Sequence, residues 1–134
     1  MTLDDMNAFM AQSPLHQWLD CRIVAYDAET TALTVYLPER PELRRSEGEP
    51  VAHGGIIAAL VDLAAHAALY AQTKHGIPTI DLRVDYLRTA SMPLTARATT
   101  RRNGRTIGVC DVEIVDRDER LSAIGRAVFL TRAS

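Results

Sequence analysis

The sequence predicts an α+β fold in which an antiparallel sheet wraps around one long central helix. The stretch 54–73 is apolar around almost its whole circumference, as expected of a buried helix. Segments with the alternation of half-buried strands precede it and follow it. At 134 residues the chain fits one domain, so we expect residues 1–134 to share a single core.

The segments before the long helix are expected to form one short helix and two strands. Residues 3–12 are typical of a helix, which Pro14 should end because proline cannot continue the backbone hydrogen-bond ladder. Residues 19–27 and 31–37 have the composition and alternation of strands. A polar loop follows over 38–53, and a loop of this length in a small domain is often functional.

Within the long helix, polar side chains are confined to one stripe. Asp62, His66 and Tyr70 are spaced four residues apart, which places them on one side of the helix. The helix should end near Thr73, because a glycine and a proline follow shortly afterwards.

Four strands are expected after the helix, joined as a meander that curls around it. They cover residues 79–88, 94–102, 105–116 and 121–131. Asn103 and Gly104 separate the second strand from the third. This dipeptide predicts a two-residue type I′ turn, in which both residues have positive φ. A sheet wrapped in this way around one helix is the hotdog fold.

Charge and composition exclude several classes of partner. The net charge of −2 and the pI near 6.1 favour neither nucleic acid nor an anionic membrane surface. The N-terminus has no basic segment followed by an apolar one, and 54–69 carries Asp62 and His66. We therefore expect neither a targeting peptide nor a membrane span. The expected location is the cytoplasm, where Cys21 and Cys110 would be free thiols.

Chemistry is expected first at the start of the long helix, where His53 precedes Gly54 and Gly55. Backbone N–H groups in the first turn of a helix have no partner within it and carry partial positive charge. A carbonyl oxygen placed there would be polarised by donors that are fixed in advance. Gly54 is the candidate for the principal donor, since a side chain would block the approach. His53 either caps the helix or orients this loop.

Asp62 is the second candidate for chemistry, because it is a carboxylate within an otherwise apolar helix. Such a group needs a partner or a wet cavity. It is therefore either a structural acid, bonded to backbone or to His66, or a catalytic base, and the sequence leaves both open. His53, Asp62, His66 and His75 are suitable metal ligands by type. Their spacing matches no recognised metal motif, so no metal site is expected.

Residues 53–62, HGGIIAALVD, resemble the motif of the phenylacetate-degradation (PaaI-like) branch of the hotdog thioesterases, within the 4-hydroxybenzoyl-CoA thioesterase superfamily. Residues 79–90, TIDLRVDYLRTA, resemble the family strand that follows the helix. The resemblance extends over the whole chain in length and element order. It implies hydrolysis of an acyl-CoA thioester to a free acid and coenzyme A, with no cofactor besides the coenzyme A of the substrate.

The resemblance also implies roles for individual residues. Asp62 would be the base or nucleophile, and Gly54 would donate its N–H to the thioester carbonyl. His53 would support the loop, with Gly55 beside the substrate, and Thr79 would help to hold the attacking water. In the family the site forms between two protomers, so Asp62 of one chain would face Gly54 of the other.

The sequence does not decide which residues contact the rest of the substrate. Glu47 lies six residues before His53, where relatives have Asn or Gln, and a carboxylate cannot donate their hydrogen bond unless it is protonated. Glu47 is therefore either a second acid or, as we favour, exposed on a shifted loop. Four arginines either bind the coenzyme A phosphates or are solvated side chains: Arg88, Arg101, Arg102 and Arg105.

Two other functions compete with hydrolysis. One is a hotdog dehydratase or hydratase of hydroxyacyl or enoyl thioesters, although its usual Pro-Gly-His-Phe-like segment does not occur. The other is a non-catalytic acyl-CoA-binding protein, which would not need Asp62. Self-association as a dimer or a dimer of dimers is expected, because strand 79–88 leaves an exposed edge. Ala58, Ala59 and Ala65 would leave room for an aromatic or medium-chain acyl group.

Overall fold

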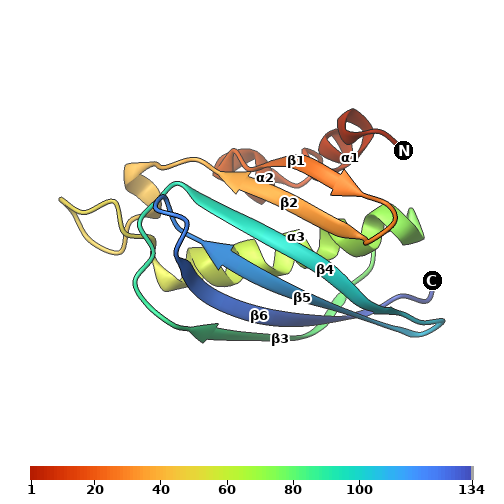
Figure 1. Ribbon diagram of the computed structural model, residues 1–134. Coiled ribbons are helices and arrows are strands. Elements are labelled where there is room, and N and C mark those ends of the chain that lie inside the picture. The colour runs from red at the N-terminus through yellow and green to blue at the C-terminus, as the bar shows by residue number, and fades with distance from the viewer. Residues whose placement is uncertain (134) are drawn as a thin grey trace.

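One long helix, α3 (Gly54–Thr73), lies against a six-stranded antiparallel sheet in the computed structural model, which describes residues 1–133 (Figure 1). In space the strands follow the order β1-β2-β4-β5-β6-β3. Their bounds are β1 Arg22–Asp27, β2 Ala32–Leu37, β3 Thr79–Tyr86, β4 Leu94–Asn103, β5 Ile107–Val115 and β6 Leu121–Leu130. A 3₁₀ turn, η1, covers Pro41–Leu43. The predicted hotdog architecture is confirmed.

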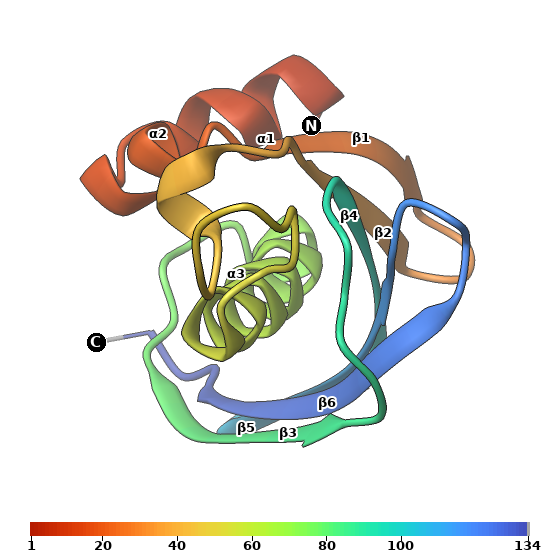
Figure 2. The ribbon, with the colours of Figure 1, turned by 90° about the vertical axis from the view of Figure 1, so that its left-hand side faces the viewer.

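The sheet curls around α3, which occupies the core (Figure 2). The helix begins after His53, whose backbone is extended, and ends at Lys74, whose φ is 62°. These limits agree with the helix predicted over 54–73. By length and hydropathy α3 could cross a membrane, but in this fold it is the buried helix beneath the sheet.

Small residues allow α3 to lie close to the sheet. A β-carbon on Gly125 of β6 would lie 2.6 Å from Cγ1 of Val61 on α3, and one on Gly108 of β5 would lie 2.9 Å from Cδ1 of Leu69. Neither position can hold a side chain unless these neighbouring atoms move. Four alanines of β4 and β6 are fully buried: Ala96, Ala98, Ala123 and Ala127. Glycine and alanine therefore set the spacing between helix and sheet.

Two short helices, and not one, precede β1: α1 Leu3–Met10 and α2 Pro14–Leu19. The helix predicted over 3–12 is confirmed as α1. Pro14 does not end it, because α1 ends at Met10 and Pro14 is the first residue of α2. A proline lacks only an N–H that has no helical partner in the first turn. The Ser13 hydroxyl caps this turn by accepting from the His16 N–H at 3.5 Å.

Asn7 fastens α1 to the sheet. Its side-chain amide donates to the Ile23 carbonyl at 2.9 Å, and its side-chain oxygen accepts from the Ile23 N–H at 2.8 Å. Met6 and Met10 of α1 are buried. As a result α1 lies over β1 and beside α3 (Figure 2).

The strand β3 lies at the edge of the sheet beside β6, not beside β4. The predicted meander is therefore confirmed only for β4, β5 and β6, and β2 takes the place next to β4. Periodicity shows which side chains share a face of a strand, but it does not show which strand is the neighbour.

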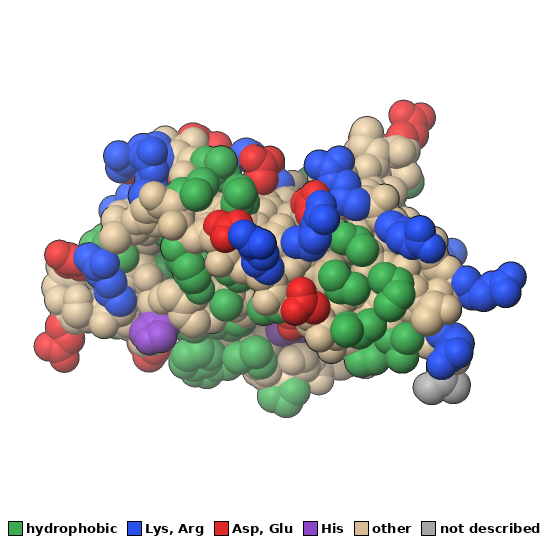
Figure 3. Space-filling model, turned by 90° about the horizontal axis from the view of Figure 1, so that it is seen from below, with side chains coloured by type: hydrophobic (Ala, Val, Ile, Leu, Met, Phe, Trp, Pro, Cys, Tyr) green, Lys and Arg blue, Asp and Glu red, His purple; other side chains and the backbone are tan. Residues whose placement is uncertain are grey.

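The exposed edge predicted for the strand after α3 is confirmed. The other side of β3 pairs with no strand within residues 1–133. Large apolar side chains remain exposed on β3 or directly after it: Ile80, Leu82, Tyr86 and Leu87. Figure 3, a view of the side of the molecule that carries β3 and β6, shows apolar side chains in groups between charged ones.

The hairpin between β4 and β5 does not use the type I′ turn predicted at Asn103 and Gly104. Neither residue has a positive φ, and Asn103 pairs with Gly108, so the loop is longer than two residues. Thr131, which follows β6, binds this loop twice. Its N–H donates to the Thr106 carbonyl at 2.8 Å, and its hydroxyl donates to the Gly104 carbonyl at 2.6 Å. These distant contacts outweigh the local preference of the Asn-Gly pair.

We expect Gly125→Ala to lower the free energy of unfolding by about 1–3 kcal/mol, because the new methyl group would overlap Val61 and push α3 away from β6. Urea denaturation measures the change. Gly76→Ala is the control, since a β-carbon there meets no heavy atom within 4 Å. The control should be at least as stable as the wild type. Equal stability of the two variants would contradict the packing described above.

Candidate active site

Hydrogen bonds within the chain hold the start of α3 in place. The His53 N–H donates to the Leu43 carbonyl of η1 at 2.8 Å. The His53 carbonyl accepts from the N–H groups of Ile56 and Ile57 at 2.9 and 3.3 Å. The His53 ring caps the helix, because its Nδ1 accepts from the Gly55 N–H at 2.9 Å. An accepting Nδ1 means that the neutral ring carries its proton on Nε2.

Gly54 is left with one free donor. Its carbonyl accepts from the Tyr86 hydroxyl at 2.7 Å, while its N–H has no acceptor within residues 1–133. The peptide group between Gly54 and Gly55 is thus held at both ends, by Tyr86 at its oxygen and by His53 at its nitrogen. A free N–H in the first turn of a 20-residue helix, on a backbone fixed in this way, is suited to binding an oxyanion.

The two glycines of the motif have different surroundings. A β-carbon on Gly55 would lie 3.1 Å from Nδ1 of His53, so a side chain at position 55 would crowd the capping ring. A β-carbon on Gly54 would make ordinary contact with the Tyr86 ring, at 3.6 Å. Packing within the chain therefore requires glycine at position 55 more than at position 54. The Gly55 N–H is also occupied by the cap, so only the Gly54 N–H is available to a ligand.

The structure brings Asp62 and Thr79 together. Thr79 is the first residue of β3, and its hydroxyl donates to Oδ1 of Asp62 at 2.7 Å. The other carboxylate oxygen of Asp62 has no hydrogen-bond partner within residues 1–133, and His66 does not bond to it there. Within the same residues, no three His, Cys, Asp or Glu side chains gather as metal ligands.

A cavity of about 360 Å³ opens beside Asp62, between α1 and α3, and we name it the Asp62 cavity. The predicted polar stripe lines it, because Asp62, His66 and Tyr70 all face it from α3. Phe9 of α1 stacks on Tyr70, with ring centroids 3.7 Å apart and planes 5° from parallel. Burial lowers the pKa of the His66 imidazole, although the Asp62 carboxylate acts in the opposite direction. The burial of the His66 ring thus favours its neutral form.

Gly54 and Asp62 lie too far apart on α3 to act on one carbonyl group of a substrate. They are eight residues apart in one helix, which corresponds to about 12 Å along the axis. Gly54 lines a different hollow of about 260 Å³, together with Arg45, Tyr86 and Arg88, and we name it the Gly54 hollow. The two candidate residues therefore line two separate spaces, which we name the candidate half-sites.

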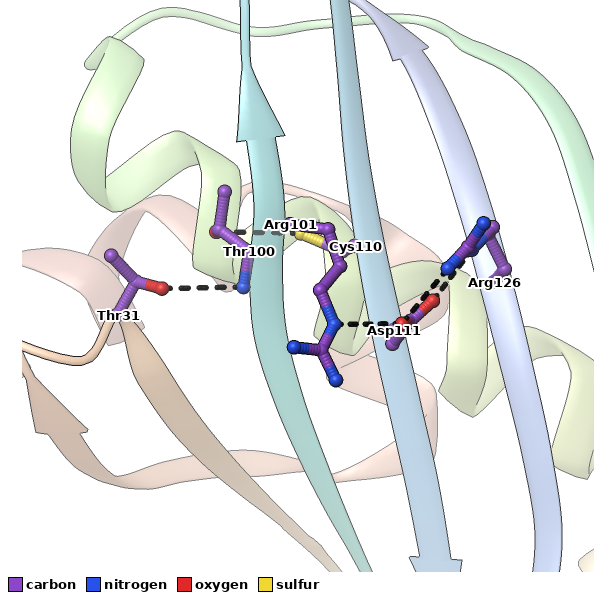
Figure 4. Close-up of polar contacts among 6 residues, drawn as sticks. All are labelled: Thr31, Thr100, Arg101, Cys110, Asp111 and Arg126. Atoms are coloured by element: carbon purple, nitrogen blue, oxygen red, sulfur yellow. Dashed lines mark hydrogen bonds and ion pairs between the residues drawn. The ribbon is translucent and has the colours of Figure 1, made fainter.

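The remaining basic candidates lie away from both half-sites. Three arginines flank the β4–β5 hairpin: Arg101, Arg102 and Arg105. In one protomer this hairpin lies at the opposite end of α3 from Gly54 (Figure 1). The Arg101 Nε donates to Asp111 at 2.8 Å, and Arg126 binds the same carboxylate (Figure 4). These hydrogen bonds, the one from Arg126 first, lower the pKa of the Asp111 carboxyl.

Glu47 lies in the loop before α3 and is exposed in the single chain. It forms no ion pair with residues 1–133. This position corresponds to the exposed alternative that we favoured for Glu47, and its relation to substrate stays a prediction.

Sequence reasoning missed three residues that line the half-sites. Tyr86 and Arg45 lie in the Gly54 hollow, and Phe9 lies in the Asp62 cavity. Tyr86 is 32 residues from the carbonyl that it binds, and Phe9 reaches the cavity only because α1 folds back over α3. The apolar alternation of β3, which includes Tyr86, was the one signal available for any of them.

Comparison with known proteins shows the family of this chain. Residues 49–123, more than half of the sequence, match the model of the thioesterase superfamily (4HBT). VNG_1336C of Halobacterium salinarum, a protein named as an esterase, is 35% identical over 114 residues, which cover 77% of this chain and 76% of that protein. The chain belongs to the thioesterase superfamily. The predicted family is therefore confirmed, and the enzyme is a thioester hydrolase.

Two Escherichia coli proteins extend the comparison for this thioesterase. YigI, a medium/long-chain acyl-CoA thioesterase, is 26% identical over 138 residues, which cover 91% of this chain and 88% of YigI. The solved structure of PaaI, from the phenylacetic acid degradation operon, has a TM-score of 0.79 at 24% identity and covers 99% of this chain and 97% of PaaI. At that identity the PaaI structure shows the shared fold.

In this thioesterase, Gly55→Ala should lower the free energy of unfolding by about 1 kcal/mol relative to Gly54→Ala. Both changes reduce the entropy of the unfolded chain to a similar extent. Only Gly55→Ala places a methyl group 3.1 Å from Nδ1 of His53, where it displaces the cap. Chemical denaturation of the two variants measures the difference. The cap would be contradicted by equal stabilities together with an unchanged Nδ1 chemical shift of His53 in the Gly55→Ala protein.

Proposed function

We propose that this thioesterase hydrolyses acyl-CoA thioesters, with the Gly54 N–H polarising the carbonyl group and Asp62 acting as base or nucleophile. The observation that carries the proposal is the free Gly54 N–H at the start of α3, on a backbone held by His53 and Tyr86. Membership of the thioesterase superfamily and the acyl-CoA substrates of YigI support the substrate class. The HGGIIAALVD motif supports a place in the PaaI-like branch.

The chemistry follows from where charge develops. When water attacks the carbonyl carbon, the carbonyl oxygen becomes negative, and the Gly54 N–H and the positive end of α3 stabilise it. Asp62 accepts a proton from the water, the C–S bond breaks, and the departing thiolate recovers that proton as the coenzyme A thiol. Direct attack by Asp62 would instead form an anhydride, which water then hydrolyses. Either route consumes only water, so we propose no further cofactor.

Thr79 acts in this proposal as a positioning residue. Its hydroxyl donates to Oδ1 of Asp62, which fixes the orientation of the carboxylate and leaves Oδ2 for the attacking water. The oxygen of the Thr79 hydroxyl keeps lone pairs that can accept from the same water.

Two protomers complete the site. Figure 2 shows that the sheet leaves one side of α3 uncovered, between α1 and β3. Pairing of two free β3 edges about a twofold axis would continue the sheet and cover Ile80 and Leu82, which are exposed in one chain. The two α3 helices would then run antiparallel, so that Gly54 of one chain faces Asp62 of the other.

The coenzyme A phosphates are proposed to bind near the Gly54 hollow. Arg45 and Arg88 line it beside the free N–H, and guanidinium groups pair well with phosphates. Arg101 is less suited to this role, because its Nε is already bound to Asp111.

Gly54→Pro should lower kcat for acyl-CoA hydrolysis by about 10²–10³-fold, because it removes the proposed donor. Proline is tolerated at the first helical residue, and the ψ of 139° at His53 is the extended conformation that a following proline requires. The matched control is Gly54→Ala, which keeps the N–H and should lose less than about tenfold.

Release of the coenzyme A thiol measures the activity of both variants. An equal loss in Gly54→Ala and Gly54→Pro would show that space, and not the donor, is what matters at position 54. Loss of enoyl absorbance without thiol release would indicate a hydratase instead.

Asp62→Asn should lower kcat by about 10²–10⁴-fold, because it removes the base and keeps the shape of the side chain. Mixing this variant with Gly54→Pro tests the two-protomer site. A heterodimer of the two variants holds one complete site, so subunit exchange should restore activity to about a quarter of the wild-type value. If both groups acted within one chain, the mixture would stay as inactive as its components.

A further inference from the structure

The Asp62 cavity extends along α3 beneath α1, away from the carboxylate. Besides Phe9 and Tyr70, its apolar lining residues come from α1, β1 and α3: Met6, Met10, Ile23, Leu63 and Ala67. Uncharged polar side chains also line it, from the α1–α2 turn, α2 and α3: Gln12, Ser13, His16 and His66. No Lys or Arg is among the described residues that line it, and Asp62 is the one carboxylate there. The space therefore suits an uncharged chain and disfavours a second carboxylate, which would face Asp62 without a cation.

Tyr70, on which Phe9 stacks, is the residue of α3 in the cavity lining that lies furthest along the helix from Asp62. Tyr70 is eight residues beyond Asp62 on α3, which is about 12 Å along the axis. With C–C bonds of about 1.5 Å, an extended chain of about eight to ten carbons spans that length.

We propose that the Asp62 cavity receives the acyl group of the substrate and that Phe9 and Tyr70 set its greatest length. The preferred substrates are thioesters of uncharged, apolar acyl groups of up to about ten carbons, straight-chain or aromatic. This inference rests on the proposed function, because Asp62 at the mouth of the cavity is the residue that acts on the thioester. It also moves the acyl group away from Ala58, Ala59 and Ala65, which do not line the cavity.

The helix α1 can act as a fixed wall, because it is tied to the sheet. The two hydrogen bonds between Asn7 and Ile23 hold it at its centre, and Met6 and Met10 are buried beneath it. The Phe9 ring is further held by its contact with Tyr70. A longer acyl chain would have to separate these two rings or displace α1, and either change loses packing.

The test measures kcat/KM for a series of straight-chain acyl-CoAs from four to sixteen carbons, with phenylacetyl-CoA as an aromatic arm. In the wild type we expect kcat/KM to rise to about ten carbons and then to fall. Phe9→Leu and Tyr70→Leu, which remove the stack but keep apolar volume, should raise the ratio of kcat/KM for tetradecanoyl-CoA over octanoyl-CoA by about tenfold or more.

The control variant Trp18→Ala should keep the wild-type profile, because it removes an exposed aromatic side chain of α2 that does not line the cavity. Unchanged profiles in both leucine variants, with hydrolysis intact, would overturn the inference and leave the proposed function standing.

Binding of non-hydrolysable S-alkyl-CoA thioethers gives a readout that does not depend on activity. Affinity of the wild type should increase with alkyl length and level off near ten carbons, whereas in Phe9→Leu it should continue to increase. The absence of thiol release from every acyl-CoA would refute the proposed function. An affinity that does not change with alkyl length would refute the proposal that the Asp62 cavity binds the acyl group.

Discussion

The close contact between α3 and the sheet is the constraint on which the rest of the structure depends. Gly125 of β6 lets Val61 approach the strand backbone, and the buried alanines keep the same short spacing along the helix. Both half-sites are carried by α3, so this spacing decides where Gly54 and Asp62 stand relative to β3. A looser helix would separate Asp62 from the Thr79 hydroxyl, which belongs to the sheet.

Side-chain hydrogen bonds hold the start of α3 in place. His53 and Tyr86 hold the two ends of one peptide group, and the neighbouring N–H of Gly54 is left without a partner. A donor held in this way need not reorganise as negative charge develops, which is the main source of stabilisation in such sites. A backbone N–H is retained in every substitution except proline, so the surrounding side chains determine how precisely this donor is oriented.

Local features of the chain could be predicted from the sequence, and distant pairings could not. The limits of α3 and the stripe of Asp62, His66 and Tyr70 follow from a period along one helix. The place of β3 beside β6, by contrast, depends on how all the strands pair in the sheet. The periodicity of side chains along one strand does not determine that pairing. For the same reason the contact of Tyr86 with Gly54 was missed, although the glycine itself was singled out.

The edge strand β3 links assembly to chemistry. Its first residue, Thr79, holds the carboxylate of Asp62, and its last, Tyr86, holds the carbonyl of Gly54, while the edge between them is the surface proposed to meet a partner. A shift in the register of two such strands would carry both ends with it and misalign both half-sites together. Substitutions in β3 that favour a new partner subunit would therefore be expected to lower catalytic activity as well. For this reason we expect β3 to be among the last segments to change as related enzymes specialise.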